Sequence, residues 1–293
     1  MLSLAPCRYR NVMKLNGGPV ERLLTGKIWS GGRQMWQANA TLTEGLAARQ
    51  SRVIYGHADG SGSSDSESVA THMAISEAME RWAYFQTVKH RHERDEYGFR
   101  VDPSSNGMAA FPGFIARQAR RSARLEGIER FALLSWWEGH LDGYVIDTDW
   151  PGISAVIIPG ETGGFVAITF KKNSDYGYFF GHGAEETISE ACRRGMTEME
   201  RHERVIKRWR ESRASDAPTE LLERRSLFFA GAKGAALFEQ RLSRQAWAGP
   251  VKWETICDAE IKGPWSHYAT VWRHAYRPPS GAFMQPRDDY FFW

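Results

Sequence analysis

Cysteine is scarce in this 293-residue sequence, which has only three, at Cys7, Cys192 and Cys257. The number is odd and no two of them form a C-x-x-C pair, so we expect neither a disulfide framework nor a cysteine-based zinc site. This cysteine usage is typical of proteins in a reducing compartment. We therefore expect a cytoplasmic location.

Long apolar runs are also lacking. The most apolar stretches, such as 131–137 and 153–158, are far shorter than the roughly 20 residues of a membrane-spanning helix. The first residues do not form the apolar core of a signal peptide. The sequence therefore predicts a soluble protein with no membrane partner.

Neither sign of charge dominates. The formal net charge of +3 is too small to indicate nucleic acid as a partner. Basic clusters at 117–124 and 207–210 are typical of solvated helix faces, and a nucleic-acid-binding protein is an alternative that rests on them alone. The 42% apolar and 25% charged residues indicate a globular protein with a sizeable core.

Aromatic residues, in contrast, are plentiful, with 12 tryptophans and 10 tyrosines. The sequence ends in four of them, YFFW, at 290–293. This segment is too apolar to remain in water. We expect it to be docked, on this chain or on a partner.

The pattern E-x-x-E-R occurs three times, at 77–81, 126–130 and 200–204, each time late in a segment with helical periodicity. Glutamates three residues apart lie on one face of a helix, so two carboxylates can point at one target. A cation would relieve the repulsion between them. Magnesium with a nucleotide triphosphate fits, because it takes oxygen ligands from a few carboxylates and from phosphate.

The periodicity of apolar residues predicts an α/β or α+β fold in which a strand, a glycine-bearing loop and a helix recur about three times. The loops are expected at 55–66, where Gly and Ser suit an anion at a helix N-terminus, and at 181–183. Long helices are expected at 67–90, 115–137 and 184–210, shorter ones within 217–245, and strands at 144–146, 153–158, 165–170 and within 250–275. We expect one domain, 1–293, with a strand-rich segment 1–65, the three long helices in 66–210 and a C-terminal segment 211–293.

Three segments, in order, resemble the signatures of the YcaO family. Residues 62–81 contain G-S-S, Ala70 and E-A-M-E-R, similar to the family's G-K-G…A-x-x-S-A-x-x-E-A-x-E-R. Residues 105–130 contain S-N-G-M-A-A and E-G-I-E-R, similar to S-N-G-L-A-A-G…E-x-x-E-R-D. Residues 181–198 contain G-H-G-A and A-C-R-R-G-M-T-E, similar to G-x-G-A…A-x-x-R-A-L-T-E.

The resemblance implies a YcaO-like fold around mixed sheets and an ATP- and Mg2+-dependent cyclodehydratase. Such an enzyme activates peptide backbone amides by O-phosphorylation and gives azoline heterocycles in a ribosomally made peptide natural product. Alternatives are thioamide or amidine formation by the same chemistry, or a catalytically degenerate scaffold protein. The implied partners are a precursor peptide and a protein that recognises its leader, either an adenylating-enzyme-like or a dehydrogenase subunit. A homodimer is compatible with the sequence.

The resemblance also assigns site residues. The catalytic and magnesium-binding residues are Glu77, Glu80, Glu126 and Glu129. The nucleotide contacts are Ser61, Ser63, Ser64, Arg81, Gln118, Arg130, Arg194 and Glu198. For Arg81 and Arg130, an intrahelical salt bridge is the alternative role. Since Glu198 and Glu200 lie about 200° apart on a helix, only one of them can face the site, and the third signature selects Glu198 over Glu200 and Glu203.

The sequence departs from the family pattern at several positions. Ser63 replaces the family's lysine or arginine, Gln118 replaces a glutamate, and Phe114 replaces an asparagine. Gln118 keeps an oxygen ligand but lacks the negative charge, which weakens magnesium binding. The proline-rich tail of azoline-forming members is absent, which leaves the Trp293 carboxylate as a candidate base.

Overall fold

The computed structural model describes residue 9 and residues 11–47, 53–55, 58–112, 116–173, 177–212 and 217–292. Cys7, Phe114 and Trp293 lie outside the described residues, as do parts of the predicted loop 55–66. The chain divides into two compact units. Unit 1 comprises Met1–Arg49, His57–Gly127 and Glu254–Arg277, and unit 2 comprises Gln50–Gly56, Ile128–Trp253 and Pro278–Trp293. The prediction of one continuous domain stays a prediction.

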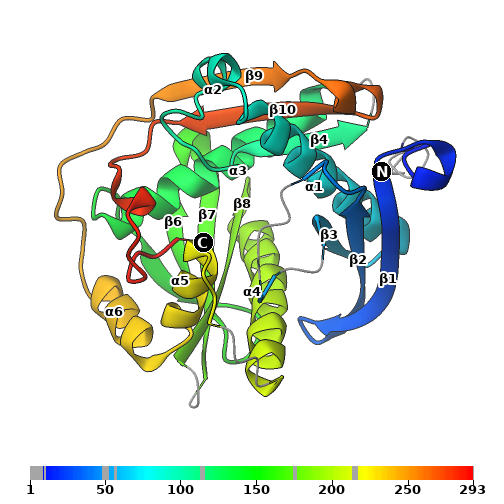
Figure 1. Ribbon diagram of the computed structural model, residues 1–293. Coiled ribbons are helices and arrows are strands. Elements are labelled where there is room, and N and C mark those ends of the chain that lie inside the picture. Colours follow the sequence, from blue (N-terminus) through cyan, green and yellow to red (C-terminus); the bar gives the residue numbers. More distant parts are fainter. Residues whose placement is uncertain are drawn as a thin grey trace. The chain divides into compact units, whose positions relative to one another are not determined.

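Unit 1 contains two antiparallel three-stranded sheets (Figure 1). The first has the order β1 (Val20–Ser30), β2 (Arg33–Leu42), β3 (Gly60–Ser64), and the second has the order β4 (Met108–Pro112), β10 (Ala269–Tyr276), β9 (Thr255–Ile261). Helix α1 (Glu67–Thr87) packs on strands of both sheets, and the short α2 (Arg91–Glu96) follows it. Met79 and Trp82 of α1 are buried in one core with Trp265 and Val271.

Unit 2 is built on one antiparallel sheet of four strands in sequential order. These are β5 (Tyr144–Asp147), β6 (Ser154–Pro159), β7 (Phe165–Asn173) and β8 (Gly177–Glu185). Helix α4 (Ile188–Glu211) lies along β7 and β8 (Figure 1). Helices α5 (Leu221–Phe229) and α6 (Ala232–Leu242) follow it. Helix α3 (Ala116–Trp137) has its first half in unit 1 and its second half in unit 2.

Short 3-10 helices complete the described elements. They are η2 (Lys14–Asn16), η3 (Glu161–Gly163), η4 (Pro264–His267) and η5 (Ala282–Met284). The α+β class and the helices expected near 67–90, 115–137 and 217–245 are confirmed, since apolar periodicity is most reliable over long segments. Among the helices that the structure describes, none combines the length and apolar character that crossing a bilayer requires.

The two glycine-bearing segments predicted as loops are wrong, because both are strands. Residues 60–64 form β3, which pairs with β2, and residues 181–183 lie inside β8. The third long helix consequently begins at Ile188 and not at 184. The glycines are needed for packing: a Cβ on Gly62 would lie 2.3 Å from the carbonyl oxygen of Ala70 in α1. Only a strand without side chains at these positions can approach the helix so closely.

The aromatic C-terminus is docked within the chain, as predicted, for the described residues 290–292. Tyr290, Phe291 and Phe292 are 3%, 0% and 5% exposed, and Phe291 stacks on Trp137 and Phe238. The fully buried Arg225 of α5 donates to three carbonyl oxygens of the tail. These belong to Gln285 (3.0 Å), Arg287 (3.0 Å) and Phe292 (3.3 Å).

Arg225→Met is expected to lower the free energy of unfolding by about 3 kcal/mol, because it leaves three carbonyl groups of the tail, that of Phe292 buried, without their donor. Urea denaturation followed by circular dichroism measures this loss. Arg208→Met, at an exposed position of α4, is the matched control and should change stability by less than about 0.5 kcal/mol. Equal stability of the two variants would contradict the role assigned to Arg225.

Gly62→Ala is expected to destabilise the protein by about 2 kcal/mol, since the added Cβ would meet the Ala70 carbonyl and the Met73 Cβ, at 2.3 and 2.5 Å. Gly26→Ala in β1 is the control, because a Cβ there meets nothing within 4 Å. The same denaturation measurement distinguishes the two. A neutral Gly62→Ala would show that β3 has room to move away from α1.

Candidate functional site

The first and third signatures build the same local structure, one in each unit. In unit 1, the backbone N–H of Ser61 in β3 donates to Glu77 Oε2 of α1 at 2.8 Å. In unit 2, the backbone N–H of His182 in β8 donates to Glu198 Oε2 of α4 at 3.1 Å. The donor and the acceptor are 16 residues apart in both cases. Each pair thus ties the carboxylate of a helix to the strand that precedes it.

Small residues on both elements make this approach possible. Each donor stands between two glycines: Gly60 and Gly62 in β3, and Gly181 and Gly183 in β8. A Cβ on these glycines would lie between 2.1 and 2.5 Å from a backbone oxygen of the facing helix. The helices offer small residues at the same places, namely the fully buried Ala70, Ala74 and Ala78 in α1 and Ala191 and Gly195 in α4.

The second signature uses glycine to bring α3 to the second sheet of unit 1. Gly107 has a φ of +75°, and its carbonyl accepts from the His274 N–H of β10 at 2.7 Å. A Cβ on Gly127, within α3, would lie 2.5 Å from the His274 carbonyl. In the adjoining β4, the Ala110 N–H donates to Glu80 Oε1 at 2.8 Å. Glu126, which precedes Gly127, is thereby brought close enough to Glu80 to interact electrostatically with it.

Glu77, Glu80 and Glu126 form what we call the unit 1 carboxylate cluster. Burial and the charge of Glu126 raise the pKa of Glu80 well above its ordinary value, and the charge of Glu77 adds to this. Arg81 binds Glu77 at 2.6 Å across one helical turn, which is the intrahelical salt bridge given as the alternative role of Arg81. Arg81 thus pairs with Glu77, while the charges of Glu126 and Glu77 both disfavour ionisation of the buried Glu80.

The other predicted nucleotide contacts of unit 1 differ in their surroundings. The Ser63 hydroxyl is buried and makes no hydrogen bond within the described part of the chain. Ser64 accepts from the Ser66 N–H at 3.3 Å. Gln118, at the start of α3, is exposed. A buried hydroxyl without a partner is costly, so Ser63 is a group that a ligand would satisfy.

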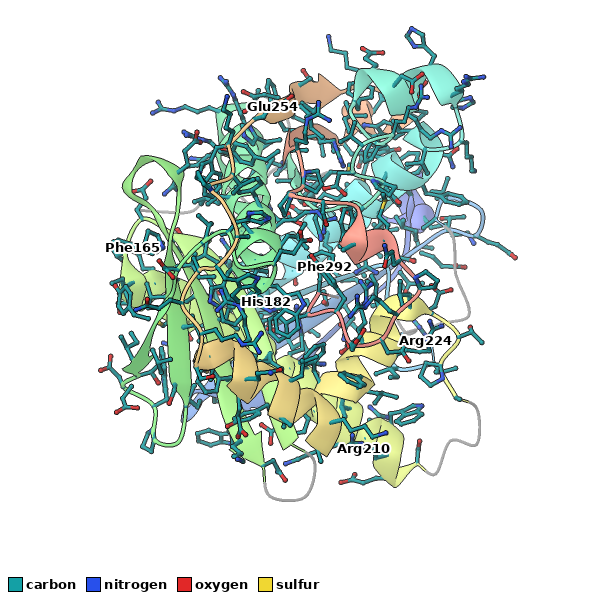
Figure 2. All side chains as sticks on the ribbon, turned by 90° about the vertical axis from the view of Figure 1, so that its left-hand side faces the viewer. Phe165, His182, Arg210, Arg224, Glu254 and Phe292 are labelled. Atoms are coloured by element: carbon teal, nitrogen blue, oxygen red, sulfur yellow. The ribbon has the colours of Figure 1, made fainter. Side chains whose placement is uncertain are left out.

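Glu129, His182 and Glu198 form a second group, the unit 2 cluster, in which one ligand atom from each residue lies within 4.8 Å of the others. No other group of three in the described ranges meets this condition. The His182 ring is buried on β8, between the glycines of the third signature (Figure 2). Burial lowers its pKa, which favours the neutral imidazole. Sequence reasoning missed His182, although its place in G-x-G, 16 residues before Glu198, identifies it.

The C-terminal tail contacts His182 of this cluster and Arg130, the neighbour of Glu129 in the sequence. The Arg130 guanidinium carbon lies 4.8 Å from the ring centre of Phe283 and 4.2 Å from that of Phe292. Phe291 meets the His182 ring edge to face, with the ring centres 5.9 Å apart. The tail thus limits the rotation of the His182 and Arg130 side chains.

Arg194 of α4 is another predicted nucleotide contact. Its guanidinium pairs with the Glu185 carboxylate at 3.0 Å.

The third E-x-x-E-R copy has a different environment from the other two. Glu203 is 7% exposed and accepts from Lys207 at 2.7 Å and from Lys171 at 3.3 Å. Burial would raise its pKa, but the two lysines more than offset this and lower it. Its charge is therefore already balanced. Glu198, in contrast, lies in one group with Glu129 and His182, and its role in the site stays a prediction.

Two solved structures share the fold of this chain. YcaO from Methanopyrus kandleri, bound with AMPPCP and Mg2+, superposes with a TM-score of 0.54 at 13% identity, over 91% of this chain and 88% of that chain. The E. coli microcin synthetase McbBCD complex with pro-MccB17 bound contains a chain with a TM-score of 0.54 at 11% identity, over 86% and 87% of the two chains. No protein-family model and no curated protein matches the sequence. Likeness at this identity shows the fold, which is YcaO-like as the signatures predicted.

Glu80→Gln is expected to stabilise the metal-free protein at pH 8 and to leave its stability unchanged near pH 4.5. The raised pKa means that the folded protein retains a proton that the unfolded chain releases above about pH 4.5, so stability is lost as the pH rises from there towards the raised value. Glutamine has no proton to lose. Urea denaturation at the two pH values measures the difference.

Glu44→Gln is the control, since Glu44 is exposed in the same unit. This variant should change the free energy of unfolding by the same small amount at pH 4.5 and at pH 8. If Glu80→Gln gave the same stability change at pH 4.5 and pH 8, the electrostatic description of the unit 1 cluster would be wrong.

Proposed function

Taking the YcaO-like fold as the premise, we propose that this protein is an ATP- and Mg2+-dependent enzyme that activates backbone amides of a precursor peptide by O-phosphorylation and gives azolines. The observation that carries this proposal is the unit 1 carboxylate cluster. Strand N–H groups hold Glu77 and Glu80, and burial together with repulsion from Glu126 and Glu77 raises the pKa of Glu80. A divalent cation would relieve that repulsion.

The residues present fit a magnesium–nucleotide complex. In unit 1, the carboxylates that would hold Mg2+ are Glu77, Glu80 and Glu126, and the polar groups that would contact the nucleotide are Ser61, Ser63, Ser64, Arg81 and Gln118. In unit 2, the corresponding candidates are Glu129 for Mg2+ and Arg130, Arg194 and Glu198 for the nucleotide. The buried Ser63 hydroxyl, which lacks a hydrogen bond within the described residues, is an independent sign of a ligand in unit 1. Bound Mg2+ would supply neutralisation of phosphate charge, which is the main need of phosphoryl transfer.

What the two structural neighbours bind supports ATP and a peptide as the proposed substrates. One of them is bound with AMPPCP and Mg2+, and the other belongs to a complex with pro-MccB17. By analogy, the substrate is a peptide, delivered by a partner protein of the adenylating-enzyme-like or dehydrogenase kind. In the reaction, a side-chain thiol or hydroxyl of the peptide adds to the activated amide carbon, and the amide oxygen leaves with the phosphate.

Thioamide formation uses the same activation, with sulfide as the nucleophile. Mass spectrometry of the peptide product decides between the two, because azoline formation removes one water and thioamide formation replaces oxygen with sulfur. A degenerate scaffold is a second candidate function. It is favoured by Gln118, which is exposed and uncharged, and by Ser63, which supplies no positive charge for phosphate.

Glu77→Gln and Glu126→Gln are each expected to weaken Mg–ATP binding about tenfold or more, equivalent to roughly 1.4 kcal/mol, because each removes one charge that holds the cation. Isothermal titration calorimetry with Mg–ATP measures the effect. Glu200→Gln, in the third E-x-x-E-R copy, is the matched control and should bind as the wild type does.

Two outcomes would reject this proposal. If the wild type binds no Mg–ATP, with or without a partner protein, the chain is a scaffold. If it binds Mg–ATP and all three variants do so equally well, the unit 1 cluster is not the nucleotide site.

A further inference from the structure

His182 brings a nitrogen donor into a group that otherwise offers carboxylate oxygens. In unit 1, the equivalent position between the two strand glycines is Ser61, whose hydroxyl lies 3.4 Å from Glu77 Oε2. In unit 2, the same backbone position carries an imidazole whose Nδ1 lies 3.9 Å from Glu198 Oε1. The two repeats therefore share a scaffold but differ in the chemistry of their donors.

The unit 2 cluster is held in place by several independent contacts. The His182 N–H fixes one oxygen of Glu198, which leaves the other oxygen on the side of the His182 ring. The edge-to-face contact with the fully buried Phe291 limits rotation of that ring. Glu129 lies in the last half of α3, a 22-residue helix. Three donors from a strand and two helices are thus presented together, and two of them, His182 and Glu198, have little conformational freedom to lose on binding.

The geometry suits a single ion. The three ligand atoms lie within 4.8 Å of one another. Ligands of one tetrahedral ion with bonds of about 2.1 Å lie about 3.4 Å apart, so small side-chain rotations suffice to close the site. The Glu198 side chain is 38% exposed, which gives an ion a route from solvent and leaves room for water as a further ligand.

We propose that Glu129, His182 and Glu198 bind a divalent late first-row transition ion of the Zn2+ type in preference to Mg2+. Imidazole nitrogen is a good ligand for Zn2+ and for its first-row neighbours, whereas Mg2+ takes oxygen ligands almost exclusively. This site refines the roles of Glu129 and Glu198 proposed above. It requires neither ATP nor a peptide, so it holds independently of the proposed enzymatic function.

The test uses the full-length protein, freed of metal with a chelator and without nucleotide. Calorimetric titration with Zn2+ and with Mg2+ is expected to show one Zn2+ per chain, bound at least about tenfold tighter than Mg2+. His182→Asn and Glu198→Gln should each weaken Zn2+ binding about tenfold or more. His267→Asn, which removes an exposed histidine of unit 1, should leave it unchanged. Anomalous diffraction from crystals soaked in Zn2+ should place the ion between the three side chains.

Equal affinities for Zn2+ and Mg2+ would overturn the inference, as would a variant pair that binds Zn2+ as tightly as the wild type. Circular dichroism of the chelator-treated variants shows whether each is folded. If His182→Asn fails to fold, Glu198→Gln and the anomalous map still decide the question, since Glu198 is partly exposed and glutamine has the same size without the charge. Loss of Mg–ATP binding with Zn2+ binding intact would reject the enzymatic proposal alone.

Discussion

The close approach of a glycine strand to a helix is the constraint on which the rest of this structure depends. In β3 and in β8, two glycines remove the side chains that would otherwise separate strand from helix. The strand N–H between them then reaches a glutamate of that helix, Glu77 or Glu198. A carboxylate that accepts such a bond has lost part of its rotational freedom before any ligand arrives. The packing thus determines where each carboxylate points. It also excludes any side chain larger than hydrogen at the glycine positions of the contact.

This arrangement sets the electrostatics of the candidate site. Backbone N–H groups orient carboxylates but bring no full positive charge, so burial and repulsion from Glu126 raise the pKa of Glu80. Glu203 shows the opposite solution, since Lys171 and Lys207 neutralise it and its pKa falls. Two copies of one sequence pattern therefore reach opposite electrostatic states. The difference lies in what surrounds each copy and not in the pattern itself.

The long helices could be predicted from the sequence, because their apolar periodicity extends over more than 20 residues. The glycine segments could not be predicted as strands, because glycine and serine have little intrinsic preference for strands. The packing that requires the glycines comes from a helix later in the chain. The resemblance to the third signature predicted Glu198 as a site residue. It left the residue type at the middle position of G-x-G unspecified, so His182 was recognised only once its spacing to Glu198 was compared with that of Ser61 to Glu77. Nor could it place Arg130 against Phe292, 162 positions further along the sequence, because that contact arises only when the tail docks.

The internal repeat explains how one fold presents two different sets of donors. A backbone hydrogen bond holds the glutamate in each repeat, so the residue that supplies the N–H is free to vary without loss of that bond. In unit 1 this residue is Ser61, and in unit 2 it is His182. Substitution at such a position changes the ligand chemistry while the strand, the helix and the carboxylate stay where they are. The position between the two glycines is therefore where this scaffold can acquire a new metal preference at least structural cost, and His182 occupies it.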